Sequence, residues 1–294
     1  MEKIGDNLKM SFKTMLEVMV PEYMPVGIVA ALLGFIYSSN SLVLSNIKLI
    51  YLILSVIFII GGYNSFNAIV DVKIDAINKP HRPLPMKKIT VRSVKLITLV
   101  SFLLAILFSY LISIYSLIIA LFTIVFAILY SIKPINLKGR FIIGTLIANL
   151  IYTIFFPLIG WSVFPLDKIP FIILIYLFIF GFTIAALKDF EDVLGDSKYG
   201  AHTIINKLGY KRTLWVLVAS NILNIFMLTT FLFYNLINLY YFVTLFFFVV
   251  VLILNVSRLF KNKNIKIGSE VFNSAMLIMI LMELSVITVK FLLK

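Results

Sequence analysis

Nine stretches of this chain are each long and apolar enough to cross a lipid bilayer, and this feature limits the fold more than any other. A transmembrane helix needs about 20 mostly apolar residues. Because the apolar stretches recur along all 294 residues, no separate soluble domain fits, and we expect one domain over 1–294. The predicted spans are Met19–Tyr37, Leu49–Val70, Val94–Ile112, Tyr115–Ile132, Phe141–Val163, Phe171–Leu187, Leu214–Tyr234, Tyr240–Val256 and Val271–Leu292.

These spans predict an all-α membrane protein with about nine transmembrane helices in a bundle. Its Lys and Arg residues indicate which side each loop faces. They concentrate in the N-terminal segment and in the loops after the second, fourth, sixth and eighth spans, which all lie on one side. Cytoplasmic loops carry an excess of Lys and Arg, so we expect a cytoplasmic N-terminus in a multi-pass protein of the cell (plasma) membrane. The basic residues outside these segments are Lys48, Lys95, Lys168, Lys290 and Lys294.

Composition excludes several kinds of site. The net charge of +13 does not indicate a nucleic-acid partner, because the basic residues punctuate apolar segments and do not interleave with stacking aromatics. The chain has no cysteine, which excludes disulfides, thiolate catalysis and cysteine-ligated metals. His81 and His202 are the only histidines, so a multi-histidine metal site is excluded too.

The first of two acidic clusters follows the second span. Asn67, Asp71 and Asp75 are four residues apart, so on a helix they lie on one face. Neighbouring carboxylates repel each other unless a cation lies between them. Mg²⁺ prefers oxygen ligands and is usually held by one or two carboxylates together with phosphate oxygens. The spacing therefore predicts that these residues form a magnesium site, in which Asn67 either adds a neutral oxygen or donates a hydrogen bond to a phosphate.

The second cluster follows the sixth span and repeats the pattern. Asp192 and Asp196 are four residues apart, and Asp189 lies one turn earlier. Gly195 is expected to loosen or end the helix there and to permit close backbone approach. A single such pair is explained as well by a solvated helix end. Two pairs at the ends of apolar helices, where buried charge is costly, favour a metal site that includes Asp189, Asp192 and Asp196.

Basic residues near both clusters predict a diphosphate site. Lys and Arg bind phosphate as a point charge and as a fork, respectively. Some lie in the segment 78–85, where three prolines prevent a regular helix. Each residue alone is also explained by the charge bias of cytoplasmic loops. The predicted phosphate contacts are Lys79, Arg82, Lys133, Lys138 and Lys188.

The two clusters resemble the motifs of the UbiA-type intramembrane prenyltransferases, and the resemblance covers nearly the whole chain. The family's first motif is close to N-D-x-x-D-x-x-x-D, which matches residues 67–75 and is followed by the family-like N-K-P-x-R-P-L-P at 78–85. Its second motif resembles D-x-x-G-D-x-x-x-G-x-x-T, which matches residues 192–203. The segment from Tyr130 to Lys138 resembles the family's Y-S-x-x-P-x-x-x-K.

Two positions depart from the family pattern. Ala68 replaces a common Asp in the first motif and removes one possible ligand. Near the first helix, where many members have an Arg-Pro pair, this chain has Val20 and Pro21. A phosphate contact expected from that arginine is therefore missing.

The resemblance implies Mg²⁺-dependent transfer of a prenyl group, here geranylgeranyl, from an isoprenyl diphosphate to a lipophilic acceptor at the cytoplasmic side of the membrane. The motif loops are expected at about 67–92 and 188–212. No obligatory protein partner is expected. Tyr130 is expected to face the allylic cation, because aromatic rings attract cations. The residues implied as catalytic are Asn67, Asp71, Asp75, Tyr130, Asp192 and Asp196.

The acceptor stays open at this point. The segment 78–85 resembles the lipid-forming and chlorophyll-type branches, which favours geranylgeranylglyceryl phosphate, with an aromatic quinone precursor as the alternative. A cation-coupled transporter is a further alternative, but its ionisable residues would lie near the midplane on broken helices. Here both acidic clusters lie at the cytoplasmic ends of spans, and the middle parts of the spans hold essentially no charge except Glu283. His81 and His202 lie inside the motif segments. Each is expected to act either as a proton acceptor from the substrate or as a surface residue.

Overall fold

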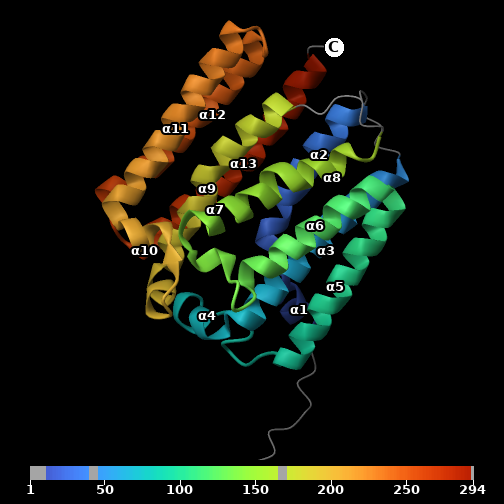
Figure 1. Cartoon of the computed structure of the whole chain (residues 1–294), viewed down its shortest axis with the longest axis vertical. Coiled ribbons are helices and arrows are strands. Elements are labelled where there is room, and N and C mark those ends of the chain that lie inside the picture. The colour runs from blue at the N-terminus through green and yellow to red at the C-terminus, as the bar shows by residue number, and fades with distance from the viewer. Residues whose placement is uncertain (1–10, 40–45, 165–170, 293–294) are drawn as a thin grey trace, which may run out of the picture.

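The computed structural model describes residues 11–39, 46–164 and 171–292. This part of the chain is almost entirely helical (Figure 1). Nine of its helices are long and apolar enough to cross a membrane, as predicted. The elements are α1 (Phe12–Met19), η1 (Pro21–Tyr23), α2 (Met24–Ser39), α3 (Ile47–Val70), α4 (Val72–Asn78), α5 (Val91–Ile112), α6 (Ile114–Ser131), η2 (Leu137–Gly139), α7 (Phe141–Leu150), η3 (Ile151–Phe155), α8 (Phe156–Trp161), α9 (Phe171–Lys198), β1 (His202–Thr203), α10 (Ile204–Leu208), α11 (Tyr210–Phe233), α12 (Leu239–Lys261) and α13 (Ile265–Leu292).

Several helices extend beyond the predicted apolar spans. Helix α9 continues to Lys198, whereas its predicted span ends at Leu187, and α13 begins at Ile265, whereas its predicted span begins at Val271. The reason is physical: hydropathy marks the part of a helix that lies in lipid, while backbone hydrogen bonding continues into the polar region. The second acidic cluster thus lies on α9 with the helical spacing expected for it, and the helix continues into the segment expected as the second motif loop.

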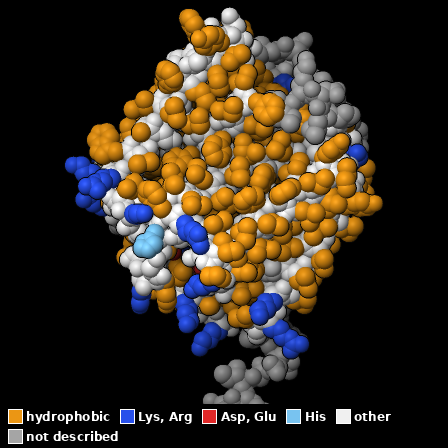
Figure 2. Space-filling view, viewed as in Figure 1, with side chains coloured by type: hydrophobic (Ala, Val, Ile, Leu, Met, Phe, Trp, Pro, Cys, Tyr) orange, Lys and Arg blue, Asp and Glu red, His pale blue; other side chains and the backbone are white. Residues whose placement is uncertain are grey.

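The bundle has a buried centre and an apolar outer surface. Helix α3 is the most enclosed span, with 61% of its apolar window buried, whereas α11 has only 28% buried. Helices α9, α11, α12 and α13 pack around one another, α3 packs against α5, and α2 packs against α8. Figure 2 shows a continuous apolar surface over most of the visible face. The first acidic cluster begins at the end of α3 and the second lies on α9, so both arise next to inner parts of the bundle.

Glycine allows α2 and α8 to approach backbone to backbone. A Cβ placed on Gly34 would lie 1.8 Å from the carbonyl oxygen of Pro157, and one on Gly160 would lie 1.8 Å from that of Ala31. Small residues at helix interfaces permit this close packing in membranes. Between α7 and α8 the chain forms one π-helical turn, η3, and such turns often lie at functional sites.

The short elements gather at one end of the bundle, which we call the motif end. It comprises α1, α4, residues 79–90, η2, β1 and α10, and in Figure 1 α1, α4 and α10 lie together there, away from the last turns of α13. Figure 2 shows Lys and Arg side chains beyond the apolar surface at this end. Both acidic clusters lie at the motif end.

Candidate active site

The first motif lies where α3 ends and α4 begins. Asp71 stands between the two helices, but its amide donates to the Asn67 carbonyl at 2.8 Å and its carbonyl accepts from the Asp75 amide at 2.8 Å. The four-residue hydrogen-bond pattern continues through the break, so the three side chains stay on one face. Asp71 and Asp75 are 3% and 5% exposed, and Ser131 Oγ donates to Asn67 Oδ1 at 2.8 Å.

The second motif occupies the last turns of α9. Because this helix is continuous from Phe171 to Lys198, Asp189, Asp192 and Asp196 follow one another at three- and four-residue spacing on one face. Gly195 does not end the helix. It permits close packing, because a Cβ at this position would lie 2.7 Å from the Asn78 side chain.

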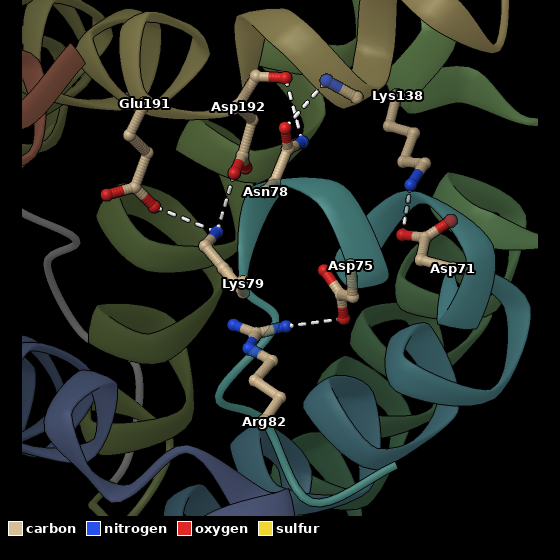
Figure 3. Close-up of polar contacts among 9 residues, drawn as sticks. Asp71, Asp75, Asn78, Lys79, Arg82, Lys138, Glu191 and Asp192 are labelled. Carbon is tan, nitrogen blue, oxygen red and sulfur yellow. Dashed lines mark hydrogen bonds and ion pairs between the residues drawn. The ribbon is translucent and has the colours of Figure 1, made fainter. Parts of the chain in front are cut away.

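Asn78 joins the two motifs (Figure 3). Its Nδ2 donates to the Asp192 carbonyl at 2.8 Å, and its Oδ1 accepts from the Gly195 amide at 2.6 Å. Asn78 is the last residue of α4, whereas both partners belong to α9. These two hydrogen bonds therefore set the distance between the acidic clusters.

Two carboxylates of the first motif each have a basic partner. Lys138 forms an ion pair with Asp71, and Arg82 Nη1 lies 2.9 Å from Asp75 Oδ2. Burial raises the pKa of Asp71, and attraction to Lys138 opposes that rise only in part. Burial disfavours the charged form of Arg82, but attraction to Asp75 outweighs it and raises the pKa of Arg82 above its ordinary value.

Lys79 is shared by two carboxylates of the second motif. Its Nζ lies 2.8 Å from Glu191 Oε1 and 2.7 Å from Asp192 Oδ1 (Figure 3). Burial disfavours the charged ammonium, but attraction to Asp192 and other neighbours outweighs this effect and raises the pKa of Lys79 above its ordinary value. Since Lys79 directly follows α4, this ion pair forms a second link between the motifs.

The charged residues line one polar pocket of about 40 Å³. All of the predicted site residues except Lys133 contribute to it. Lys133 lies on an exposed turn, and His81 and His202 are also exposed, so their roles stay predictions. The predicted residues that line the pocket are Asn67, Asp71, Asp75, Lys79, Arg82, Tyr130, Lys138, Lys188, Asp189, Asp192 and Asp196.

A second cavity of about 100 Å³, which we call the chamber, continues from the polar pocket into the bundle. Both are lined by Asn64, Tyr130, Lys138, Lys188 and Asp189. Beyond these shared groups the chamber becomes largely apolar and aromatic. The site therefore combines a charged pocket at the motif end with an adjoining space that suits a hydrocarbon group.

The polar pocket fits a magnesium ion that shares its ligands with a substrate. Within the described residues, no three carboxylate or imidazole groups come close enough to hold a metal by themselves. Mg²⁺ does not need such a cage, because it usually binds one or two carboxylates, water and substrate phosphate oxygens. Asp71 and Asp192 supply oxygens from opposite motifs, and in the described part of the chain Asp196 forms no ion pair.

Sequence reasoning missed three groups of the site. Asn64 lines both cavities, Asn78 joins the motifs, and Glu191 pairs with Lys79. A signal for the first was present, since Asn64 lies three residues before Asn67 and so extends the same helical face. Asn78 lies 114 positions before Asp192 and 117 positions before Gly195 in the sequence. No local pattern predicts a contact over such a separation.

Comparison with known proteins gives consistent matches. The model of the UbiA prenyltransferase family matches residues 27–281. A protein of Sulfurisphaera tokodaii named digeranylgeranylglyceryl phosphate synthase is 32% identical over 231 residues, which are 78% of this chain and 81% of that protein. A protein of the same name from Methanococcoides burtonii is 28% identical and covers 90% of this chain and 96% of its own.

Solved structures match over nearly the whole chain. One, from work on digeranylgeranylglyceryl phosphate synthase in membranes, is 26% identical with a TM-score of 0.69, and the match covers 94% of this chain and 97% of the other. A UbiA homolog from Archaeoglobus fulgidus bound to GPP and Mg²⁺ has a TM-score of 0.74 at 16% identity, with coverage of 94% and 99%. The second likeness concerns the fold alone.

Proposed function

Because this chain belongs to the UbiA prenyltransferase family, we propose that it transfers a geranylgeranyl group from geranylgeranyl diphosphate to geranylgeranylglyceryl phosphate. The observation that carries the proposal is the convergence of both acidic motifs and four basic residues on one pocket that adjoins an apolar chamber. The choice of acceptor is supported by the name digeranylgeranylglyceryl phosphate synthase that relatives at 32% identity carry.

The donor diphosphate binds in the polar pocket. Asn67, Asp71, Asp75, Asp189, Asp192 and Asp196 are the oxygen ligands available to Mg²⁺. The use of Mg²⁺ itself is supported by the Archaeoglobus homolog that is bound to GPP and Mg²⁺. When bound, Mg²⁺ neutralises the negative charge that grows on the diphosphate as its bond to carbon breaks. Lys79, Arg82, Lys138 and Lys188 then bind the remaining phosphate oxygens.

The basic residues change partners when substrate binds. Without a diphosphate, Lys138, Arg82 and Lys79 neutralise Asp71, Asp75 and Asp192. A diphosphate offers these cations oxygens of higher charge, while its metal takes over the carboxylates. The pocket thus remains neutralised in both states, which avoids leaving an unpaired charge buried.

The chamber shelters the prenyl group. Tyr63 and Tyr130 line it with ring centroids 5.7 Å apart, and Tyr23 and Tyr152 line it as well. Aromatic faces attract a cation, so these rings stabilise the positive charge on the allylic carbon after the C–O bond breaks. The apolar walls exclude water from this carbon. The hydroxyl oxygen of the acceptor forms the new ether bond there, and its proton passes to the diphosphate, which is the leaving group and remains in the polar pocket.

The motif end faces the cytoplasm of the cell that makes the protein, and the membrane is the plasma membrane. The support is the gathering of Lys and Arg at this end (Figure 2), which matches the charge bias of cytoplasmic loops. Diphosphate substrates made in the cytoplasm would then reach the pocket directly.

A transfer assay tests the proposal. Purified protein in liposomes receives radiolabelled geranylgeranyl diphosphate, Mg²⁺, and either geranylgeranylglyceryl phosphate or 4-hydroxybenzoate. We expect a lipid-soluble product with the first acceptor only, lost on chelation of Mg²⁺ and in Asp71→Asn. Product with the aromatic acceptor alone would assign the alternative acceptor, and product that survives chelation would contradict the metal site.

A further inference from the structure

A third cavity lies at the end of the bundle opposite the motif end. Its volume is about 470 Å³, and we call it the distal cavity. Its lining is mainly apolar and includes Ile173, Leu177 and Val286. Its polar groups include Tyr37 and Tyr241, whose hydroxyls share a hydrogen bond of 2.8 Å. Such a lining suits a hydrocarbon chain and not a charged group.

The chamber and the distal cavity lie on the same faces of three helices. On α9, Gly181 lines the chamber and Leu177 lines the distal cavity, four residues apart. On α13 the corresponding residues are Met279 and Val286, seven apart. Spacings of four and seven residues return to the same side of a helix. Val26 and Tyr37 repeat the relation on α2, so the two cavities follow one another along a common line.

Three fully buried side chains occupy positions between the two linings along these helices, and we call them the partition. They are Leu33 on α2, Phe180 on α9 and Glu283 on α13. In the described part of the chain, neither oxygen of Glu283 has a hydrogen-bond partner. A buried carboxyl without a partner destabilises its surroundings, so the partition is less stable when closed than an all-hydrocarbon partition.

The length of a geranylgeranyl chain can be compared with the distances along α9 from the polar pocket to each cavity. Along α9, Lys188 at the entrance of the chamber is about 10 Å from Gly181 at its far end, and about 22 Å from Ile173 in the distal cavity, at 1.5 Å per residue. An extended chain gains about 3.5 Å per three bonds, so an isoprene unit of four bonds adds about 5 Å. Two units therefore span the chamber, whereas four units reach the distal cavity.

We propose that the distal cavity receives the far half of the donor's geranylgeranyl chain, which displaces the partition of Leu33, Phe180 and Glu283 on entry. This inference rests on the proposed geranylgeranyl transfer and assigns the donor chain a path inside the bundle. The competing path, sideways from the chamber into lipid, needs neither the partition nor the distal cavity.

The test compares donors of different length in variants that fill the distal cavity. Ile173→Trp and Val286→Trp place an indole in open space, which limits overpacking. The matched controls are Ile175→Trp and Leu284→Trp, two residues away on the same helices, with side chains 49% and 41% exposed on the outer surface. Each variant is assayed with geranyl and geranylgeranyl diphosphate at a fixed concentration of geranylgeranylglyceryl phosphate.

We expect the ratio of kcat/KM for the longer donor to that for the shorter one to fall about tenfold or more in the cavity variants, and to change less than about twofold in the controls. Activity with the short donor also shows that each variant is folded. An unchanged ratio in active variants would overturn the path. Absence of transfer by the unmodified protein would instead contradict the proposed function.

A labelling experiment needs no variant. A geranylgeranyl diphosphate that carries a diazirine at its far end is bound to the unmodified protein and illuminated, and the labelled peptides are identified. Label at Ile173, Leu177 or Val286, which line the distal cavity, supports the path. Label on the outward-facing Ile175 or Leu284, or on surrounding lipid alone, contradicts it.

Discussion

The buried carboxylates at the motif end differ from the buried carboxylate of Glu283 in whether they have a basic partner. At the motif end, Asp71, Asp75 and Asp192 each have a basic partner within the pocket. In the middle of the bundle, Glu283 is fully buried and, among the described residues, has no partner for either oxygen. The pairing at the motif end is what lets several charges lie together beneath the surface.

The paired carboxylates line the pocket that we assign to the anionic substrate, whereas Glu283 lies outside that pocket. Removing one member of a buried ion pair costs about 3–5 kcal/mol, because the other charge is left uncompensated. Removing an unpaired carboxyl should instead relieve a cost. The comparison thus predicts opposite signs for similar substitutions at the two places.

The largest expected effect is on catalysis, in Asp192→Asn. The substitution keeps the shape of the side chain but removes a carboxylate available to Mg²⁺, and one lost interaction with the transition state is worth about 10²–10³ in rate. We expect kcat/KM to fall by about 10²–10³, measured by transfer of labelled geranylgeranyl. Glu270→Gln, at an exposed ion pair on α13, is the control and should retain activity. Equal losses in both variants would show that the effect is not specific to the pocket.

The next effect is on stability, in Lys79→Met. Glu191 and Asp192 would lose their shared cation, and we expect a loss of about 3–5 kcal/mol in the free energy of unfolding. The measurement is thermal unfolding in detergent, with and without Mg²⁺. Because a divalent cation can replace the ammonium between the carboxylates, Mg²⁺ should restore more stability to this variant than to the unmodified protein. A variant as stable as the parent without Mg²⁺ would show that the pair contributes nothing.

A smaller effect is expected for Asn78→Ala, which removes two hydrogen bonds but no charge. At about 0.5–1.5 kcal/mol for each bond, the total loss should be about 1–3 kcal/mol by thermal unfolding. Asn78→Asp keeps the acceptor for the Gly195 amide and loses the donor to the Asp192 carbonyl, so one bond can be assigned. If activity falls far more than stability in Asn78→Ala, the distance between the motifs is what the side chain controls.

The sequence predicted the local features of the fold and of the site, but it did not predict the contacts between distant segments. Nine apolar stretches predicted the number of spanning helices, because length and hydropathy alone define a span. Four-residue spacing predicted the shared face of Asn67, Asp71 and Asp75, which is a local property of a helix. The partners of these carboxylates come from distant segments, and local spacing does not define them.

Two features of the motif end could not be defined from the sequence. The second motif loop was expected from about residue 188, but helix α9 continues to Lys198 because backbone hydrogen bonding does not depend on hydropathy. Lys133 was grouped with Lys138 because both follow the same helix, yet only Lys138 lines the pocket. The chain between them turns through Pro134 and Asn136, and Lys133 remains exposed. Proximity in sequence did not determine which of the two cations faces inward.

A substitution of Glu283 is expected to stabilise the protein, whereas Lys79→Met is expected to destabilise it. In Glu283→Leu an apolar side chain replaces the unpartnered carboxyl, and we expect unfolding to require about 1–3 kcal/mol more free energy. Thermal unfolding in detergent measures this change. Glu283→Gln is the control, because it keeps the shape and the buried polarity and should gain little. A loss of stability in Glu283→Leu would mean that the carboxyl has a partner in the membrane-embedded protein, such as bound water.

The smallest effect is expected at the exposed ion pair between Arg258 and Glu270, whose side chains are 45% and 47% exposed and whose atoms lie 2.9 Å apart. Its distance equals that of the buried pair Arg82–Asp75, so the two differ mainly in burial. Exposed pairs contribute about 0–1 kcal/mol because water and salt screen them. Arg258→Gln should therefore change unfolding by less than about 1 kcal/mol, with any change vanishing at high salt. If Arg258→Gln destabilised the protein as much as Lys79→Met does, burial would not be what distinguishes the charges of the pocket.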